Sequence, residues 1–237
     1  MLVLAFDTAT PCVSIALGDE ERVRGELRVA TAVGRGSGAR RHAELLAPGI
    51  ASLCEQASVA VADVSAVAVG VGPGMFTGLR VGVTTAKLLA QALRVPVVTV
   101  PSLDLVAYPA RFTTRTVVAV LDARRREVFT SSYRPVPGGV QRVSEYQVLP
   151  PAELVAELAS SAEELLLVGD GVARYRDDFD ALERAEAAGL AFDAPSAVAL
   201  LELAAARIAR EEFVAPNDVV PMYLRESDAE IGAWVHA

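Results

Sequence analysis

The chain has 237 residues, 52% of them hydrophobic, and a formal net charge of −8. This length suits one large domain or two small lobes of about 100 residues each. The acidic balance argues against tight RNA binding by this chain alone, because RNA-binding proteins present a basic face to phosphates. The one dense basic cluster is Arg124-Arg125-Arg126. No apolar run reaches the ~18 residues that a membrane-spanning helix needs.

The first residues and the cysteines indicate a cytoplasmic protein. The apolar start at Met1 has no basic residues and ends at Asp7, so it predicts a strand and not a signal peptide. The two cysteines, Cys12 and Cys54, lie in apolar patterns. We therefore expect buried free thiols and no disulfide scaffold.

The first hundred residues predict a βββαβαβ unit that ends near Pro101. Apolar, β-branched runs predict strands at 2–6, 12–17, 22–29, 65–71 and 95–100. Helical spacing predicts helices at 42–57 and 78–93. We expect a kink at Pro48, a loop at 31–39, and Thr77 near the N-cap of the second helix.

The second half repeats this pattern. Strands are expected at 117–124, 127–133, 140–148 and 165–168, and helices at 151–159 and 196–211. Ser196 is the expected N-cap of the last helix. A strand that ends in Asp, a polar turn and a second strand occur twice, at Asp7 and at Asp122.

This weak internal duplication predicts an α/β fold of the actin-like ATPase (RNase H-like) type, with two lobes that each hold a mixed sheet and flanking helices. Residues 1–101 would form the N-terminal lobe. Residues 102–237 would form a smaller, degenerate C-terminal lobe with a returning C-terminal helix and tail.

Four motifs carry a specific resemblance to a known family. They are Leu4-Ala5-Phe6-Asp7-Thr8-Ala9-Thr10, Gly72-Pro73-Gly74-Met75-Phe76-Thr77-Gly78-Leu79-Arg80-Val81-Gly82, Leu121-Asp122-Ala123-Arg124 and Pro221-Met222-Tyr223-Leu224-Arg225. On these residues the chain resembles the universal tRNA threonylcarbamoyladenosine (glycoprotease-like) family, and within it the short bacterial dimerisation subunits. The likeness spans nearly the whole chain and is weakest in 170–195.

The resemblance implies a function and a set of partners. In that family the long paralogue binds ATP and a metal and transfers the threonylcarbamoyl group to adenosine. The short subunit would be its non-catalytic partner in forming N6-threonylcarbamoyladenosine at position 37 of tRNAs that read ANN codons. The expected partners are the catalytic threonylcarbamoyltransferase paralogue and the small ATPase of the complex, with tRNA contacted only indirectly, a homodimer when isolated, and no cofactor in this subunit.

The histidines agree with the loss of a metal site. The resemblance places two histidines at i and i+4 on the first long helix of the catalytic paralogue, where they share one ion. Here the first position is His42 and the second is Leu46. The other histidine, His236, lies one residue from the end of the chain, so we expect no ordered metal.

The two Asp turns lack the glycine that lets bare backbone approach a phosphate. This holds for the turn after Asp7 and for the turn after Asp122. Two interpretations stay open at this point. Either each Asp caps its own turn, or a degenerate nucleotide cleft keeps weak contacts through Asp7, Thr8, Asp122, Gly169 and Gly171.

The residues give little support for a phosphate-binding loop, an independent kinase or ATPase, or a peptidase. The segment Gly72-Pro73-Gly74 leads into a helix, but Pro73 lacks an N–H donor and no Gly-Lys-Ser/Thr ending follows. It predicts a sharp turn, with a vestigial anion site as the alternative. An autonomous small-molecule kinase or ATPase is disfavoured by the glycine-free turns. A peptidase is disfavoured because only His42 could act as the base.

Small residues recur at every fourth position of the helix predicted at 78–93 and form a stripe of Gly78, Gly82, Ala86 and Ala90. Internal glycines weaken a helix by about 1 kcal/mol each, so another element should approach closely. Either this stripe packs on its own sheet, or it joins a helical bundle with a partner, as the family's mode of assembly suggests. The predicted partner interface is His42, Leu46, Ile50, Leu53, Phe76, Gly78, Gly82, Ala86 and Ala90. The tail residues Ile231, Trp234 and Val235 are expected to dock on this chain or on a partner.

Overall fold

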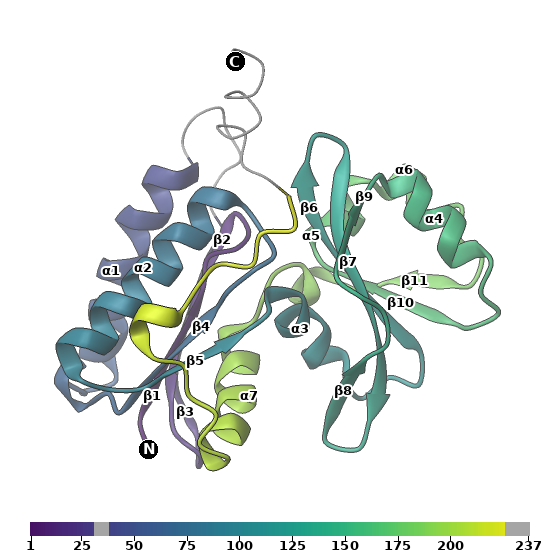
Figure 1. Cartoon of the computed structure of the whole chain (residues 1–237). Helices are drawn as coiled ribbons and strands as arrows, with labels where there is room; N and C mark the ends of the chain where they lie inside the picture. Colours follow the sequence, from purple (N-terminus) through teal and green to yellow (C-terminus); the bar gives the residue numbers. More distant parts are fainter. Residues whose placement is uncertain (31–37, 226–237) are drawn as a thin grey trace.

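The computed structural model describes residues 1–30 and 38–225, and of residues 38–41 only the backbone. Within these ranges the chain forms two lobes, each built on one mixed sheet (Figure 1). The elements are β1 Val3–Asp7, β2 Cys12–Gly18, β3 Val23–Ala30, α1 Gly38–Gln56, β4 Ala66–Gly70, α2 Phe76–Leu93, β5 Val97–Val100, α3 Ser102–Ala107, β6 Thr116–Arg124, β7 Glu127–Val136, β8 Gly139–Arg142, β9 Gln147–Leu149, α4 Pro151–Ala159, β10 Leu165–Val168, α5 Asp170–Arg174, α6 Arg176–Phe179, β11 Ala185–Ala187 and α7 Ala197–Ala209.

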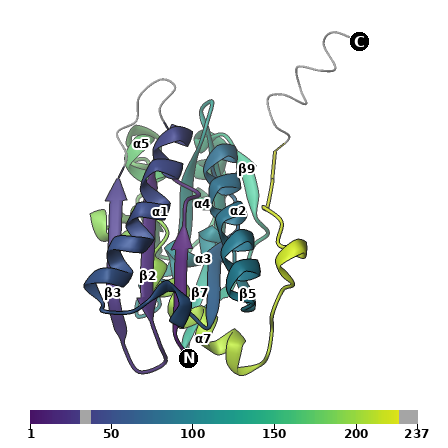
Figure 2. The same cartoon turned by 90° about the vertical axis from the view of Figure 1, so that its left-hand side faces the viewer.

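The first sheet has five strands in the order β3-β2-β1-β4-β5. The strands β1, β2 and β3 are antiparallel neighbours, and β4 and β5 run parallel to β1. Helices α1 and α2 lie side by side on one face (Figure 2), and α7 packs on the other. Strands β1 and β4 are buried along their whole lengths, as expected for strands covered on both faces.

The second sheet repeats this topology. Its six strands include the path β11-β10-β6-β7-β8, with β9 also paired to β7. Strands β6, β7 and β8 are antiparallel, and β10 and β11 run parallel to β6. The two halves thus share one strand order, and the predicted duplicated α/β fold is confirmed.

Two local predictions are corrected. The strand expected at 140–148 is two strands, β8 and β9, because the chain bends between them and the Ser144 side chain accepts a hydrogen bond from the Ser132 backbone (2.8 Å). Helix α2 begins at Phe76, so Thr77 lies inside it and does not cap it. The predicted cap of α7 is confirmed, since Ser196 accepts a hydrogen bond from the Ala199 backbone.

The short helix α3 joins the lobes by contributing to both cores. Leu105 packs with α7 and the first sheet, whereas Leu103 and Val106 pack on β6 and β7 of the second sheet. The lobe boundary near residue 101 stays a prediction, because α3 serves both sides. None of the helices in the described ranges combines the length and apolarity that crossing a bilayer requires.

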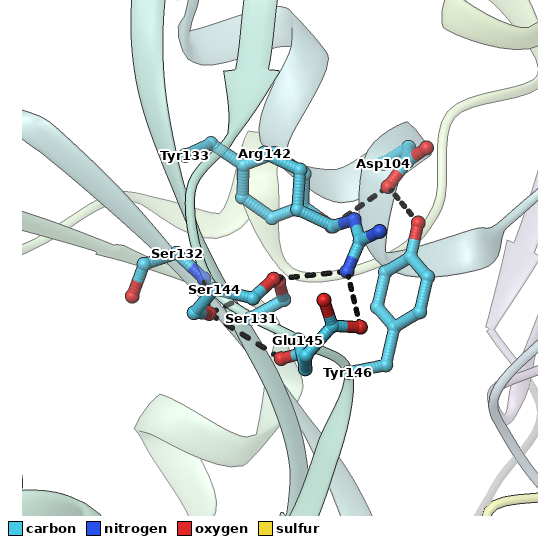
Figure 3. Close-up of polar contacts among 8 residues, drawn as sticks. All are labelled: Asp104, Ser131, Ser132, Tyr133, Arg142, Ser144, Glu145 and Tyr146. Carbon is cyan, nitrogen blue, oxygen red and sulfur yellow. Dashed lines mark hydrogen bonds and ion pairs between the residues drawn. The ribbon is translucent and has the colours of Figure 1, made fainter.

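A carboxylate on α3 fixes this joint. The Oδ1 atom of Asp104 accepts hydrogen bonds from the hydroxyl groups of Tyr133 (2.8 Å) and Tyr146 (2.7 Å), both in the second lobe (Figure 3). Burial raises the pKa of Asp104, and the two phenolic donors oppose that rise. The guanidinium of Arg142 lies 4.3 Å from the Tyr146 ring centre. The orientation of α3 on the second sheet is therefore specified by polar geometry as well as by apolar packing.

The last described segment returns to the first lobe. Val214 bridges to Val97 of β5, Asn217 accepts a hydrogen bond from Gln91 of α2 (2.8 Å), and Met222 donates its backbone N–H to Val71. This segment, yellow in Figure 1, runs along α2 and ends at Arg225 beside the second lobe.

Candidate functional site

The first Asp turn is a closed structural node. Asp7 ends β1 and is 0% exposed. Its Oδ1 accepts the backbone N–H of Ala9 (2.8 Å), and its Oδ2 accepts the hydroxyl of Ser102 (2.6 Å). Burial raises the pKa of Asp7, against the lowering effect of these hydrogen bonds. The interpretation of Asp7 as the cap of its own turn is confirmed.

Ser102 extends this node to the turn before α2. Its hydroxyl accepts the backbone N–H of Gly72 (3.0 Å), and its own N–H donates to the carbonyl of Gly72 (2.6 Å). Thr8 is also buried, and its hydroxyl donates to the carbonyl of Gly78 (2.8 Å). The side chains of Asp7, Thr8 and Ser102 are thus hydrogen-bonded inside the chain and are buried from solvent.

The second Asp turn is similarly saturated. Asp122 Oδ1 accepts hydrogen bonds from the Arg124 backbone (2.9 Å) and the Tyr175 hydroxyl (3.1 Å). Its Oδ2 pairs with the guanidinium groups of Arg124 and Arg174, at 3.1 Å each. Asp122 therefore caps its turn, as the first interpretation predicted, and neutralises two arginines.

The glycines at 169 and 171 serve packing. A Cβ at residue 171 would lie 2.8 Å from a methyl group of Val120, and a Cβ at residue 169 would overlap the carbonyl oxygen of Val120. They let α5 approach β6. Between them, Asp170 accepts the backbone N–H of Asp122 (3.0 Å), and burial raises the pKa of Asp170 to about 6.

His42 is buried, and its Nε2 lies 2.8 Å from the carbonyl oxygen of Thr10. Because a carbonyl only accepts, Nε2 carries the proton in this contact. Residues 1–30 and 38–225 contain no group of three or more His, Cys, Asp or Glu side chains arranged to hold a metal ion. His236 and the tail residues Ile231, Trp234 and Val235 lie outside the described ranges.

The predicted free thiols are confirmed. Cys12 and Cys54 are buried and unbridged. Burial raises the pKa of both thiols, which favours the protonated, unreactive form.

Eight of the nine residues predicted for the partner interface are not accessible at the surface of this chain. His42, Leu46, Ile50, Leu53, Gly78, Gly82, Ala86 and Ala90 are buried inside the first lobe. A Cβ at residue 78 or 82 would overlap atoms of Thr8, so these glycines allow α2 to approach the first hairpin. The stripe thus packs within its own lobe, which was the other interpretation. Only Phe76 stays accessible, at 39% exposure.

The outward surface of α1 and α2 carries small and apolar side chains beside charged ones such as Glu44 and Arg80. We call its small, mostly apolar part the outer helical face and define it by Ala43, Ala47, Ala51, Thr84 and Leu88, all of them exposed. Leu88 is 61% exposed, although it lies more than one turn from either end of α2. The spacing of four between its members was visible in the sequence, but the buried stripe shows the same spacing.

A cavity of about 470 Å³ lies between the lobes. Its walls are residues 74–77 at the start of α2, residues 122–125 of the β6–β7 turn, Phe129, and residues 222–225. The rings of Phe76 and Tyr223 lie 5.1 Å apart at its edge. Of the five residues predicted for a nucleotide cleft, only Asp122 lines this cavity. Sequence reasoning missed it because its walls come from three distant segments, although each segment belongs to a motif quoted above.

Comparisons with known proteins relate the whole chain to one family. The family model of the tRNA N6-adenosine threonylcarbamoyltransferases matches residues 37–233. The tRNA threonylcarbamoyladenosine biosynthesis protein TsaB of Bacillus subtilis is 29% identical over 100% of this chain and 99% of its own length. The uncharacterized protein Rv3421c of Mycobacterium tuberculosis is 43% identical over 55% of this chain. The chain spans 58% of that mycobacterial relative's length.

Solved structures agree. YeaZ from Pseudomonas aeruginosa superimposes with a TM-score of 0.76 and 29% identity, over 94% of this chain and 100% of its own. The ethanolamine utilization protein EutJ from Carboxydothermus hydrogenoformans shares the fold alone, with a TM-score of 0.53 and 9% identity over 86% of this chain and 90% of its own. The predicted actin-like architecture is confirmed.

Proposed function

This chain belongs to the tRNA N6-adenosine threonylcarbamoyltransferase family, and we propose that it acts in the biosynthesis of N6-threonylcarbamoyladenosine on tRNA as a non-catalytic subunit. In this role it binds and activates a catalytic paralogue, which holds ATP and the metal. The small ATPase of the complex would be a further partner. The named relatives from Bacillus subtilis and Escherichia coli support the pathway.

The main support for a non-catalytic role is that the carboxylates of both Asp turns are already occupied by contacts within the chain. The Asp7 carboxylate is buried and bound by Ala9 and Ser102. The Asp122 carboxylate is bound by a backbone N–H, a phenol and two guanidinium groups. A catalytic carboxylate must reach a substrate or a metal. Neither group can do so without breaking the contacts that hold its turn.

The remaining reactive groups support the same proposal. The one described histidine is buried against a carbonyl oxygen, and the thiols are buried with raised pKa values. A peptidase would need an exposed nucleophile beside a base. Surface recognition is therefore the function that these residues support best.

We assign partner binding to the outer helical face. Exposed apolar patches on otherwise polar proteins mark interaction sites. The small side chains of α1 let a second helix approach closely, and Leu88 offers an aliphatic anchor. The isolated chain would pair with itself through the same face.

The test compares Leu88→Arg with Leu190→Arg, a matched control at a position that is 83% exposed in the second half of the chain. Burying the exposed part of Leu88 stabilises a complex by about 1–2 kcal/mol, and a buried arginine adds a desolvation cost. We expect titration calorimetry with the catalytic paralogue to show binding at least about tenfold weaker for Leu88→Arg and unchanged for the control. Equal affinities for the two variants would exclude this face.

A further inference from the structure

The β6–β7 turn separates two cavities and carries the densest basic cluster of the chain. Arg124 and Arg125 line the interlobe cavity. Arg126 lines a second cavity, also of about 470 Å³, together with Arg174, Arg176 and two acidic side chains, Asp177 and Asp178. We call these five arginines, with Arg80, the arginine band. The guanidinium of Arg80 lies 4.8 Å from the ring centre of Phe76, at the edge of the interlobe cavity.

The charge of the band is only partly compensated. Asp122, whose side chain is 5% exposed, pairs with Arg124 and Arg174. Within the described ranges, Arg80, Arg126 and Arg176 form no ion pair with a carboxylate. The interlobe cavity is lined by Arg124, Arg125 and Arg225 and by one carboxylate, Asp122. In a chain of net charge −8, this is a local positive surface, and such a surface attracts anionic ligands.

The turn itself is held in an unfavourable conformation. Arg124, Arg125 and Arg126 have φ angles of 64°, 54° and 60°. The left-handed region costs a residue with a side chain roughly 1–2 kcal/mol. Arg125 and Arg126 are the two loop residues of the β6–β7 hairpin, in which Arg124 pairs with Glu127 beside a register shift. Two-residue hairpin loops favour positive φ at both positions, so the hairpin geometry sets where these arginines lie.

An aromatic platform adjoins the band. Phe76 and Tyr223 are 39% and 44% exposed, and their rings lie 5.1 Å apart. Proteins that bind single-stranded RNA stack unpaired bases on aromatic rings and on arginine planes, while cationic side chains hold the phosphates. The walls of the interlobe cavity together offer both features.

We propose that the arginine band and the Phe76–Tyr223 platform bind an unpaired nucleotide and the adjacent phosphates of tRNA in the assembled complex. This inference rests on the proposed function. It revises the expectation that tRNA is contacted only indirectly. The isolated chain binds tRNA weakly because its net charge is negative, and the contact gains strength when the catalytic paralogue holds the same RNA.

The test uses the complex of this chain with the catalytic paralogue and an unmodified tRNA that reads an ANN codon. One variant is Arg125→Gln/Arg126→Gln. Its control is Arg134→Gln/Arg184→Gln, which removes the same charge from the second lobe away from both cavities. A second variant, Tyr223→Ala, removes one ring of the platform, and Tyr223→Phe is its control. Thermal melts verify that each variant is folded.

Fluorescence anisotropy then gives tRNA affinity as a function of salt. We expect the double arginine variant to bind tRNA several-fold more weakly. Its log–log salt slope should fall by about 1.4–1.8, since each lost phosphate contact contributes roughly 0.7–0.9. Tyr223→Ala should weaken binding about tenfold with an unchanged slope. The controls should match the wild type.

Two results would overturn the inference. In the first, all variants bind tRNA with wild-type affinity and slope while the complex with the paralogue stays intact. In the second, the arginine variant loses the paralogue, which would make the band a docking site for an acidic protein segment. Failure of the wild-type chain to bind the paralogue at all would instead refute the proposed function.

Discussion

The replacement Gly78→Ala tests whether the small-residue stripe of α2 is internal. Gly78 lies in the first turn of α2, against the backbone of Thr8. Its carbonyl accepts the buried hydroxyl of Thr8 at 2.8 Å. A methyl group at this position must displace either α2 or the first hairpin, because the opposing atom is a backbone oxygen.

The expected effect follows from three contributions. Overpacking a rigid site costs about 1–3 kcal/mol, and loss of the Thr8 hydrogen bond costs about 1 kcal/mol. Alanine gains about 1 kcal/mol of helix propensity over glycine. The net expectation is a free energy of unfolding lowered by about 1–3 kcal/mol. The control Thr84→Ala, on the exposed side of α2, should raise it by a few tenths of a kcal/mol.

Urea unfolding followed by circular dichroism measures both variants on one scale. Opposite signs for Gly78→Ala and Thr84→Ala are the predicted result. If Gly78→Ala were as stable as the wild type but failed to bind the catalytic paralogue, the stripe would lie at the partner interface and its assignment to the core would be wrong.

Two further predictions concern buried carboxylates. The pKa of Asp170 is raised from 3.8 to about 6 in the folded state, so its contribution to stability is complete below about pH 4 and is lost as the pH rises through about 6. Asp170→Asn keeps an acceptor for the Asp122 N–H. It should therefore be more stable than the wild type at pH 7 by up to about 3 kcal/mol and equal to it near pH 4. A stability difference in thermal melts that does not change with pH would contradict this. Tyr133→Phe removes one of two phenolic donors to Asp104 and should destabilise the chain by about 1–3 kcal/mol. The control Tyr223→Phe should leave the stability unchanged. Equal urea midpoints for the two variants would refute the role of Asp104 in holding α3 on the second lobe.

Much of the fold could be predicted because its signals are local. The buried runs of β1 and β4 and the repeated strand–Asp–turn pattern led to the duplicated architecture. The roles of Asp7 and Asp122 as turn caps were also predictable, because Asp bonds its own backbone in turns without glycine. The break between β8 and β9 was not, since it depends on Ser144 bonding to the neighbouring strand.

Spacing alone could not separate the proposed partner surface from the buried stripe. The buried stripe and the outer helical face both repeat every four residues on the same helices, and small side chains suit a core as well as a partner. Only burial in the folded chain separates Gly82 from Leu88. The interlobe cavity was missed for another reason. Its walls meet only when α2, the β6–β7 turn and the segment ending at Arg225 come together.

The most direct test of the account is ATP turnover by the purified chain, alone and with the catalytic paralogue and tRNA. Because Asp7 and Asp122 are bound within their own turns, the chain alone should neither release phosphate from ATP nor modify adenosine. Both activities should be present once the catalytic paralogue is added. ATP hydrolysis or tRNA modification by the chain alone, abolished by Asp7→Asn, would contradict the proposal that this subunit works by recognition.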